Sequence, residues 1–506
     1  MKMKRRVYFL LNICLVLLWS SCSKDYLNTN PTDRVSEETA FQSIDNARKA
    51  LNGIYRILYT QYTNQHRDGQ GAIMINLDAM GEDYVRTNAS YVYHYQSYRW
   101  TAHRNVADAN VNAFTYAFYY IIVSNANMII TNIESIEGAE EDKKVLRGEA
   151  LALRGWAHFQ LVQLYGKRYD ATAKPNNQPG VPIVVTASTK GQPRATVEEV
   201  YTQINSDLDA ALENLSASRA NKTHVNANVV KGFKARVALA MQDWDNAVKY
   251  AREARTGAGF LMTNAQYLQG FSRIDNPEWM WGIVQPSDQV PAYGSFFAYM
   301  SANFNSAFTR VNPKCINSQL YAKIPAGDIR KKLWWDGTTA DAVNFPGVLN
   351  TDGTRVSGQT RTIYQHRKYL VPDYNNRAGD IPYMRIAEMY LIEAEALARS
   401  GKDSEAASAL LPLAVNRNPS YTLSTNTGAA LIEEIMIQRR VELWGEGFRF
   451  LDLKRTNADL DRRNTNHKLD VANIMYVPAG DNSWQWLIPQ DEIDANEAMG
   501  PEDQNP

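Results

Sequence analysis

Two stretches of the chain share one design, and that design limits the fold more than any other feature of the sequence. Residues 228–256 read NVVKGFKARVALAMQDWDNAVKYAREART, and residues 383–414 read YMRIAEMYLIEAEALARSGKDSEAASALLPLA. Each combines an alanine-rich helical pattern, a short polar turn at MQDWD or SGKD, and a second alanine-rich helical pattern. Because small residues let helices lie close together, such pairs can stack and bury a shared core. The chain is therefore predicted to be mainly α-helical.

Helical periodicity extends to further segments. Apolar residues recur at spacings of three and four in residues 39–61, 114–136 and 143–166. Thr196, followed three residues later by Glu199, forms a capping-box pattern and predicts the start of another helix. These patterns resemble tetratricopeptide-like helix pairs, although the full spacing signature of that repeat is degenerate.

Two stretches between the helices lack helical periodicity. Residues 167–195 predict a long loop, and residues 257–380 are rich in Gly, Pro, Asn and aromatic residues. A loop region this long is uncommon in a compact domain unless it is functional. We expect short strands and turns there, folded over the helical scaffold, and ligand-binding inserts around residues 70–110 and 257–380.

Aromatic side chains are the most distinctive candidates for ligand contact. In the run YVYHYQSYRW, Tyr91, Tyr93 and Tyr95 alternate, which predicts one face of an extended strand. Further rings cluster in residues 292–304 and at Trp334–Trp335. Flat apolar rings suit the C–H faces of sugars, and polar neighbours suit the hydroxyls. The alternative, that these rings pack the core, stays open.

The N-terminus has the pattern of an export signal. MKMKRR is cationic, VYFLLNICLVLLW is an apolar run too short to span a bilayer comfortably, and SSC ends at Cys22. The position of this cysteine resembles the lipobox of bacterial lipoproteins, although Trp19 stands where leucine is usual. We expect residues 1–21 to be a signal peptide and Cys22 to carry lipid. An ordinary signal peptide with a chance cysteine is the alternative.

Composition and motifs argue against an enzyme. The formal net charge is zero, and no basic block of the kind that binds nucleic acid is present. HExxH, the P-loop pattern, GxSxG and CxxC are absent, and the seven histidines are scattered. We therefore expect no catalytic role, no metal and no cofactor. A secreted glycosidase is an alternative that carboxylate counts cannot test, because some pair always exists among 54 acidic residues.

Several segments, taken in order, resemble one family. They include DYLNTNPTDRVSEETAF after Cys22, then RGEALALRGWAHFQLVQLYG, NPEWMWGIVQ and RRVELWGEGFRFLDLKR. Together they are similar to the SusD/RagB family of outer-membrane nutrient-binding lipoproteins of Bacteroidetes, over nearly the whole chain. The resemblance implies a helical fold with four tetratricopeptide-like pairs, in one SusD-like domain over residues 22–506.

The resemblance also implies a function without catalysis. Such a lipoprotein is anchored in the outer membrane, faces outward, and delivers captured oligosaccharide to a TonB-dependent SusC-like barrel. In the RagB branch the ligand is peptide. A repeat scaffold that binds a protein partner and has no nutrient role is the remaining alternative, which a concave surface lined by Asn and Lys would favour.

Ligand contacts are expected from the aromatic runs and from the GEDYVR segment before the first of them. Trp100 is the expected stacking platform. The other expected contacts are Tyr95, Tyr98, Asp83, Arg86, Tyr293 and Trp334.

The family pattern E-G-x-R-x-x-D-L falls within RRVELWGEGFRFLDLKR, residues 439–455. Helical spacing predicts that Arg449 pairs with Glu446 and Asp452 on one face. The two glycines suit close approach of a neighbouring element, and a second face of Val441, Trp444, Phe448 and Leu451 should enter the core. We expect a structural role for this motif rather than ligand binding.

Overall fold

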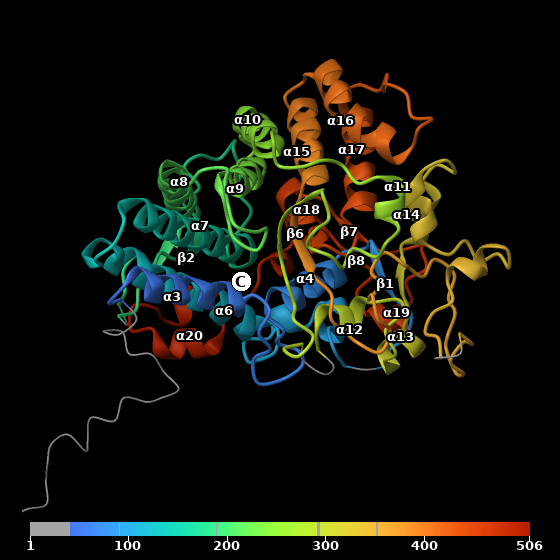
Figure 1. Cartoon of the computed structure of the whole chain (residues 1–506), viewed down its shortest axis with the longest axis horizontal. Helices are drawn as coiled ribbons and strands as arrows, with labels where there is room; N and C mark the ends of the chain where they lie inside the picture. The colour runs from blue at the N-terminus through green and yellow to red at the C-terminus, as the bar shows by residue number, and fades with distance from the viewer. Residues whose placement is uncertain (1–40, 91, 189, 291–293, 351–352) are drawn as a thin grey trace, which may run out of the picture.

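The computed structural model describes residues 41–506, except 91, 189, 291–293 and 351–352. Helices form a curved row across the left and top of Figure 1, and loops with short helices fill the right-hand side. The strands of the described residues are all short. This architecture confirms the predicted fold class.

The row consists of amphipathic and alanine-rich helices that pack on one another. They are α3 (Ile44–Ile57), α6 (Asn112–Asn132), α7 (Glu140–Tyr165), α8 (Val197–Asn214), α9 (Ala227–Ala240), α10 (Trp244–Arg255), α15 (Ile386–Arg399), α16 (Asp403–Arg417) and α17 (Gly428–Glu442). From α6 to α10, each helix packs on the next one in the chain. The row then continues from α10 to α15, which is distant in sequence, and on to α16 and α17.

The two alanine-rich segments form helix pairs, as predicted. The breaks fall at residues 241–243 between α9 and α10, and at residues 400–402 between α15 and α16. Ala247, Ala251 and Ala254 of α10 are fully buried. Because their side chains are a single methyl group, α10 can lie close to both α9 and α15. The two pairs are thereby joined into one stack.

Local signals set the ends of other helices. The hydroxyl of Thr196 accepts a hydrogen bond from the Glu199 backbone, and the Glu199 carboxylate accepts one from the Thr196 backbone. This capping box starts α8 at Val197, as the sequence predicts. α6 and the turn after it, Asn112–Ser135, form the one helix of the described residues that is long and apolar enough to cross a membrane. It packs against α3 and α7, so its apolar character is accounted for by the core.

The strands form four separate antiparallel pairs. These are β1 (Tyr84–Arg86) with β5 (Lys314–Ile316), β2 (Pro179–Pro182) with β3 (Arg194–Thr196), β4 (Trp279–Ile283) with β6 (Ile381–Arg385), and β7 (Leu460–Asp461) with β8 (Tyr476–Val477). β4 and β6 enclose residues 284–380 between them, and β6 leads directly into α15. The irregular insert is therefore closed at its base and attached to the helical row.

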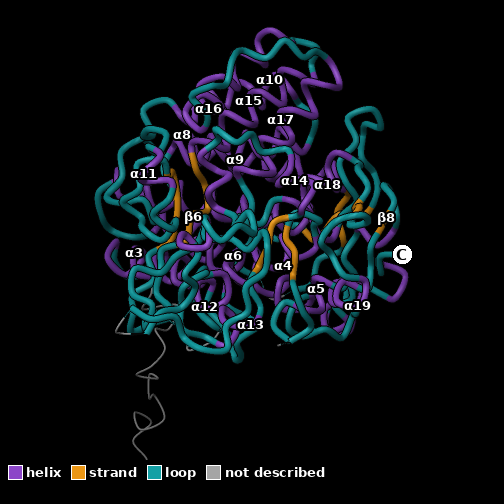
Figure 2. Tube along the Cα trace, turned by 90° about the vertical axis from the view of Figure 1, so that its right-hand side faces the viewer, coloured by secondary structure: helices purple, strands orange, loops and turns teal. Residues whose placement is uncertain are grey.

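Short elements make up the rest of the described chain. They are α4 (Gly69–Met80), α5 (Tyr95–Tyr98), α11 (Asn264–Tyr267), α12 (Phe296–Met300), α13 (Ala307–Val311), α14 (Ser318–Ala322), α18 (Arg449–Thr456), α19 (Leu469–Ala472), α20 (Gln490–Ala495) and six 3₁₀ turns. In Figure 2, loops and short helices cover most of the lower part of the face on which α11 to α14 lie, below α15 and α17. The predicted short strands and turns of residues 257–380 are confirmed.

Two local predictions are wrong. Residues 69–80 belong to the fully buried helix α4 rather than to an irregular insert. The aromatic run is not a strand, because His94 adopts a left-handed conformation (φ 56°) and residues 95–98 are helical. Tyr91 lies outside the described residues. Tyrosines at alternate positions therefore reflect a turn followed by a helix, not a pleated face.

Candidate functional site

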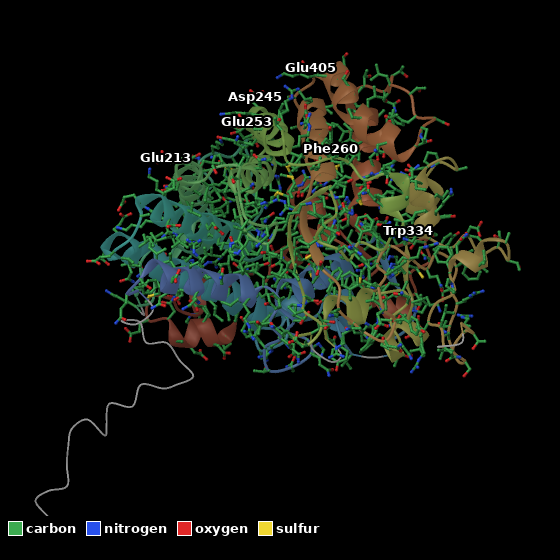
Figure 3. All side chains as sticks on the ribbon, viewed as in Figure 1. Glu213, Asp245, Glu253, Phe260, Trp334 and Glu405 are labelled. Atoms are coloured by element: carbon green, nitrogen blue, oxygen red, sulfur yellow. The ribbon has the colours of Figure 1, made fainter. Side chains whose placement is uncertain are left out.

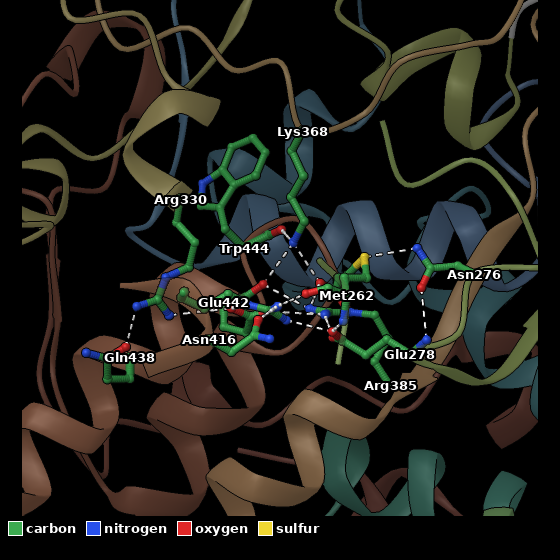
Figure 4. A network of polar contacts seen from close by, with 12 residues as sticks. Met262, Asn276, Glu278, Arg330, Lys368, Arg385, Asn416, Gln438, Glu442 and Trp444 are labelled. Carbon is green, nitrogen blue, oxygen red and sulfur yellow. Dashed lines mark hydrogen bonds and ion pairs between the residues drawn. The ribbon is translucent and has the colours of Figure 1, made fainter. Parts of the chain in front are cut away.

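The end of α17 lies in a buried ionic network. Glu442 accepts hydrogen bonds from Nη1 of Arg385 and Nη2 of Arg417, each with a donor–acceptor distance of 3.0 Å. Glu278, the residue before β4, bridges the same two arginines (Figure 4). Burial alone would raise the pKa of Glu442, but Arg417, Arg385 and Arg330 outweigh it and hold this pKa below its ordinary value. The network is thus ionised and internally matched.

Glu446 extends this network to the insert. Its carboxylate accepts hydrogen bonds from Nζ of Lys368 and Nη2 of Arg385, both with a donor–acceptor distance of 2.6 Å. Nζ of Lys368 also donates a hydrogen bond to the carbonyl oxygen of Trp444, at a distance of 2.7 Å. Because Lys368 comes from the insert and Arg385 from β6, Glu446 ties both to the segment after α17.

Gly445 and Gly447 allow this segment to turn sharply. Their φ angles are +80° and +83°, a region that side chains with a Cβ rarely adopt. A Cβ on Gly445 would lie 2.7 Å from the Tyr369 ring, and one on Gly447 would lie 2.9 Å from Cα of Met74. The predicted close approach of neighbouring elements is confirmed.

The predicted pairs within the motif are wrong. Arg449 donates to Glu82 (2.5 Å) rather than to Glu446, and Asp452 accepts from Arg439 Nε (2.8 Å). The turn at the two glycines ends α17 before Glu446, so helical spacing does not relate Glu446 to Arg449. The contacts nevertheless agree with a structural role, since the motif joins α4, β6 and α18.

The predicted second face of the motif is half right. Val441 and Trp444 are buried, whereas Phe448 and Leu451 are only partly buried. The Phe448 ring lies beneath the guanidinium of Arg439, at 5.2 Å from its centroid.

Two side chains that were predicted to contact a ligand instead bind other groups of the protein. The carboxylate of Asp83 accepts from Nε and Nη2 of Arg440. Arg86 is buried and donates to the carbonyl oxygens of Asn88 (3.0 Å) and Tyr93 (2.9 Å). Their hydrogen-bonding groups are therefore occupied by the fold, and contact with a ligand hydroxyl is not favoured.

Three predicted stacking rings are buried. Trp100 is 5% exposed, donates its Nε1 hydrogen to the carbonyl oxygen of Met80 (2.7 Å) and packs edge-on against Trp484. Tyr98 is fully buried under Arg462, and Trp334 is fully buried among packed side chains in the right-hand part of Figure 3. Core packing explains all three rings, so the structure does not support Trp100 as a stacking platform.

Tyr95 alone among the described candidates keeps part of its surface exposed. The guanidinium carbons of Arg86 and Arg99 lie 4.7 and 5.4 Å from the centroid of its ring. Its role in ligand contact stays a prediction. Tyr293 and Cys22 lie outside the described residues.

The insert contains a cavity of about 150 Å³ that none of these candidates lines. Its apolar wall includes the buried Phe345 and the half-buried Tyr374. Its polar lining residues are Asn303, Asn344, Gln365, His366 and Arg367. The side-chain amide of Asn303 bridges the backbone N–H and C=O of Val371 (2.9 and 3.0 Å), which fixes two loops of the wall. An apolar wall with few polar groups is typical of small-ligand sites.

A second, smaller cavity of about 20 Å³ adjoins the first. The two share Ala302, Gly347, Gln365 and His366 among their lining residues. Within the described chain, Nζ of Lys314, which lines the smaller cavity, has no hydrogen-bond partner, although Lys314 is only 2% exposed. Burial, with Lys314 and Lys368 nearby, lowers the pKa of His366 to about 3, so its imidazole is neutral. We call these two spaces the insert cavities.

Comparison with known proteins decides the family. The model described as "Starch-binding associating with outer membrane" matches residues 25–239, and the SusD family model matches residues 297–506. The chain belongs to the SusD/RagB family. A SusD-like protein of Formosa agariphila, P38, is 22% identical over 68% of this chain and 72% of its own length.

Solved SusD-like structures share the fold. A SusD-like carbohydrate binding protein from Bacteroides vulgatus is 27% identical, with a TM-score of 0.80 over 92% of this chain and 99% of that one. A laminarin binding SusD-like protein is 19% identical, with a TM-score of 0.70 over 92% of this chain and 100% of that one. These likenesses extend to the insert as well as to the helical row.

Sequence reasoning missed the residues of the insert cavities. Phe345, His366 and Tyr374 stand alone or beside charged residues rather than in aromatic runs. Their only signal was membership of the long irregular region. The dense aromatic runs drew attention instead, and those rings are largely core.

Proposed function

We propose that this SusD-like protein captures oligosaccharide at the cell surface and delivers it to a TonB-dependent SusC-like outer-membrane transporter. Lipid on Cys22 would anchor it in the outer membrane after removal of residues 1–21. The observation that carries the proposal is the larger insert cavity, which combines the rings of Phe345 and Tyr374 with amide and guanidinium groups. Rings bind the C–H faces of a sugar, and the polar groups orient its hydroxyls.

The size of the cavity limits how much ligand it can hold. At about 150 Å³ it is smaller than the roughly 300–1,000 Å³ of pockets that enclose drug-sized ligands. It would therefore take one ring or one substituent of a longer chain. The rest of the chain would lie over the insert surface, where Tyr95 is a further candidate contact.

The lining of the insert cavities favours binding over hydrolysis. Glycoside hydrolysis needs two carboxyl groups on either side of the scissile bond. Neither Asp nor Glu lines these two cavities of the described chain. We therefore propose that the protein has no catalytic role at this site.

The binding step is tested with a soluble form that begins at Ser23, which keeps every residue that the structure describes. A glycan array followed by calorimetry should identify at least one oligosaccharide class with saturable binding. Substitution Tyr374→Ala should weaken that binding roughly 5- to 100-fold, by analogy with the cost of losing one stacking ring. Binding of peptides but of no glycan would instead favour a RagB-type role.

The delivery step needs a separate measurement. The lipidated protein should co-purify from outer membranes with a TonB-dependent barrel, and deletion of either gene should abolish uptake of the same labelled glycan. Uptake that persists without this protein would contradict delivery while leaving capture intact.

A further inference from the structure

The insert cavities are lined by cations for which the described residues provide no salt bridge. Arg367 lines the larger cavity, and Lys314 and Arg355 line the smaller one. Nζ of Lys314 and Nε of Arg367 are buried without a hydrogen-bond partner within the described chain. Buried charges are normally paired, and leaving one unpaired is costly.

The absence of carboxylates distinguishes this site from other cavities of the molecule. No Asp or Glu contributes to the lining of either insert cavity in the described residues. Three cavities elsewhere all include acidic side chains, namely Asp170 and Asp481, Glu446 and Asp452, and Asp491 and Glu492. Among these five cavities of the described residues, only the two of the insert therefore have cations in their lining and no carboxylate.

Neighbouring cations act on two of these lining side chains. Burial and then Arg86 lower the pKa of Lys314, while the Cys315 thiol opposes them. Burial and then Arg361 lower the pKa of Arg355. Lys314 and Arg355 thus each lie near another cation, which disfavours their charged forms, and an anion entering the site would favour those charged forms again. Asp341 is the one acid that acts on Arg367 in the opposite sense.

Two of these cations also contact aromatic rings. The guanidinium carbon of Arg367 lies 5.9 Å from the centroid of the Phe345 ring. Nζ of Lys314 lies 4.2 Å from the centroid of the Tyr299 ring, a cation–π contact that contributes to packing. Arg355 is exposed and Arg367 half-buried, so both can be changed with less risk to the fold.

We propose that the insert cavities bind an anionic saccharide, a glycan with a carboxylate or sulfate group on its ring. The inference rests on the proposed capture function and names the ligand class. The sugar ring would lie against Phe345 and Tyr374, and its oxyanion would face Arg367 and the Lys314–Arg355 side. A carboxylate and a sulfate share the oxygen acceptors that guanidinium groups bind best, so the cavity chemistry accepts either source.

The test is calorimetric titration of the soluble form with four probes. These are a galacturonate oligosaccharide, a sulfated galactan oligosaccharide, a neutral β-glucan oligosaccharide and a glutamate-rich peptide. We expect at least one anionic saccharide to bind tenfold or more tightly than the neutral one, and its affinity to fall as NaCl is raised. Which anionic probe binds identifies the source of the oxyanion.

Charge variants locate the binding. Arg367→Gln and Arg355→Gln should each weaken binding of the anionic saccharide about tenfold to a hundredfold, the usual range for loss of a charge-assisted hydrogen bond. Lys332→Gln removes an exposed cation of the same insert that lines neither cavity, and should change nothing.

Three results would overturn the inference in different ways. If the neutral glucan binds as tightly as both anionic probes and the arginine variants bind normally, the ligand class is wrong and glycan capture stands. If both anionic probes bind but Arg355 and Arg367 do not matter, the site is wrong. If only the peptide binds, the ligand class and the proposed capture of oligosaccharide both fail.

Discussion

The indole N–H of Trp444 donates a hydrogen bond to the backbone carbonyl oxygen of Asp83, at a donor–acceptor distance of 2.9 Å. The carboxylate of the same Asp83 binds Arg440. One motif near the C-terminus thus holds both the backbone and the side chain of a residue some 360 positions earlier in the chain. The arginine-rich stretch 439–455 is a clasp between distant segments, and changes to it should act on stability.

Glu442→Gln should lower the free energy of unfolding by about 3–5 kcal/mol, because it removes a buried carboxylate shared by Arg385, Arg417 and Arg330 and leaves the buried cations of the network one negative charge short. Urea denaturation followed by circular dichroism measures this. The control is Glu433→Gln on the same helix, which breaks only an exposed pair with Lys323 and should cost less than about 1 kcal/mol. Equal effects of the two variants would contradict the buried network.

Trp100→Ala should lower stability by about 3–5 kcal/mol, since it removes a buried ring and the hydrogen bond to Met80. Trp335→Ala, which removes a half-exposed ring of the insert, should cost clearly less. Thermal melting compares them. A normal melting curve for Trp100→Ala with lost glycan binding would restore Trp100 to the ligand site.

Stability should fall in mild acid because buried histidines must stay neutral. Burial is the main cause that lowers the pKa to about 3 at His103, His158, His366 and His467, against an ordinary value near 6.5. Between these values the unfolded state binds more protons than the folded state, so stability is lost as pH falls from 6.5 towards 3. Asp68, whose pKa burial raises to about 8, opposes the trend.

A single histidine variant isolates the effect. The stability difference between wild type and His158→Gln should shrink by up to about 1.4 kcal/mol per pH unit as pH falls from 6.5. Urea denaturation at several pH values gives this slope. A difference that does not change with pH would mean that His158 is charged in the fold or titrates normally.

Cys22→Ala should abolish labelling by a palmitate analogue and release the protein from the membrane fraction, because the proposed anchor is lost. Cys315→Ala should keep both properties, since Cys315 is buried in β5. Continued labelling of Cys22→Ala would contradict the lipobox interpretation.

The helical scaffold could be predicted because its signals are local. Alanine periodicity defined the two pairs, and Thr196 with Glu199 marked the start of α8. The contact of α10 with α15 could not be read from periodicity, because it joins segments separated by the whole insert.

The candidate site could be predicted only as a region. Rings of Trp100 and Trp334 looked like ligand platforms, but whether a ring is covered depends on residues such as Trp484 and Trp444 from other segments. The partners of Arg449 and Asp452 were likewise mispredicted, because Arg449 binds the distant Glu82, and Asp452 binds Arg439 together with Arg455 three residues on. Cys22 and Tyr293 stay untested predictions.

The crystal structure of the soluble form with a bound anionic oligosaccharide tests ligand capture by the insert most directly. We expect density for a sugar residue in the larger insert cavity, with its ring against Tyr374 and its oxyanion within hydrogen-bond distance of Arg367. Ligand capture by the insert would be contradicted if the insert cavities were empty and density for the saccharide lay elsewhere, such as in the cavity beside Trp484 or on the surface around Tyr95.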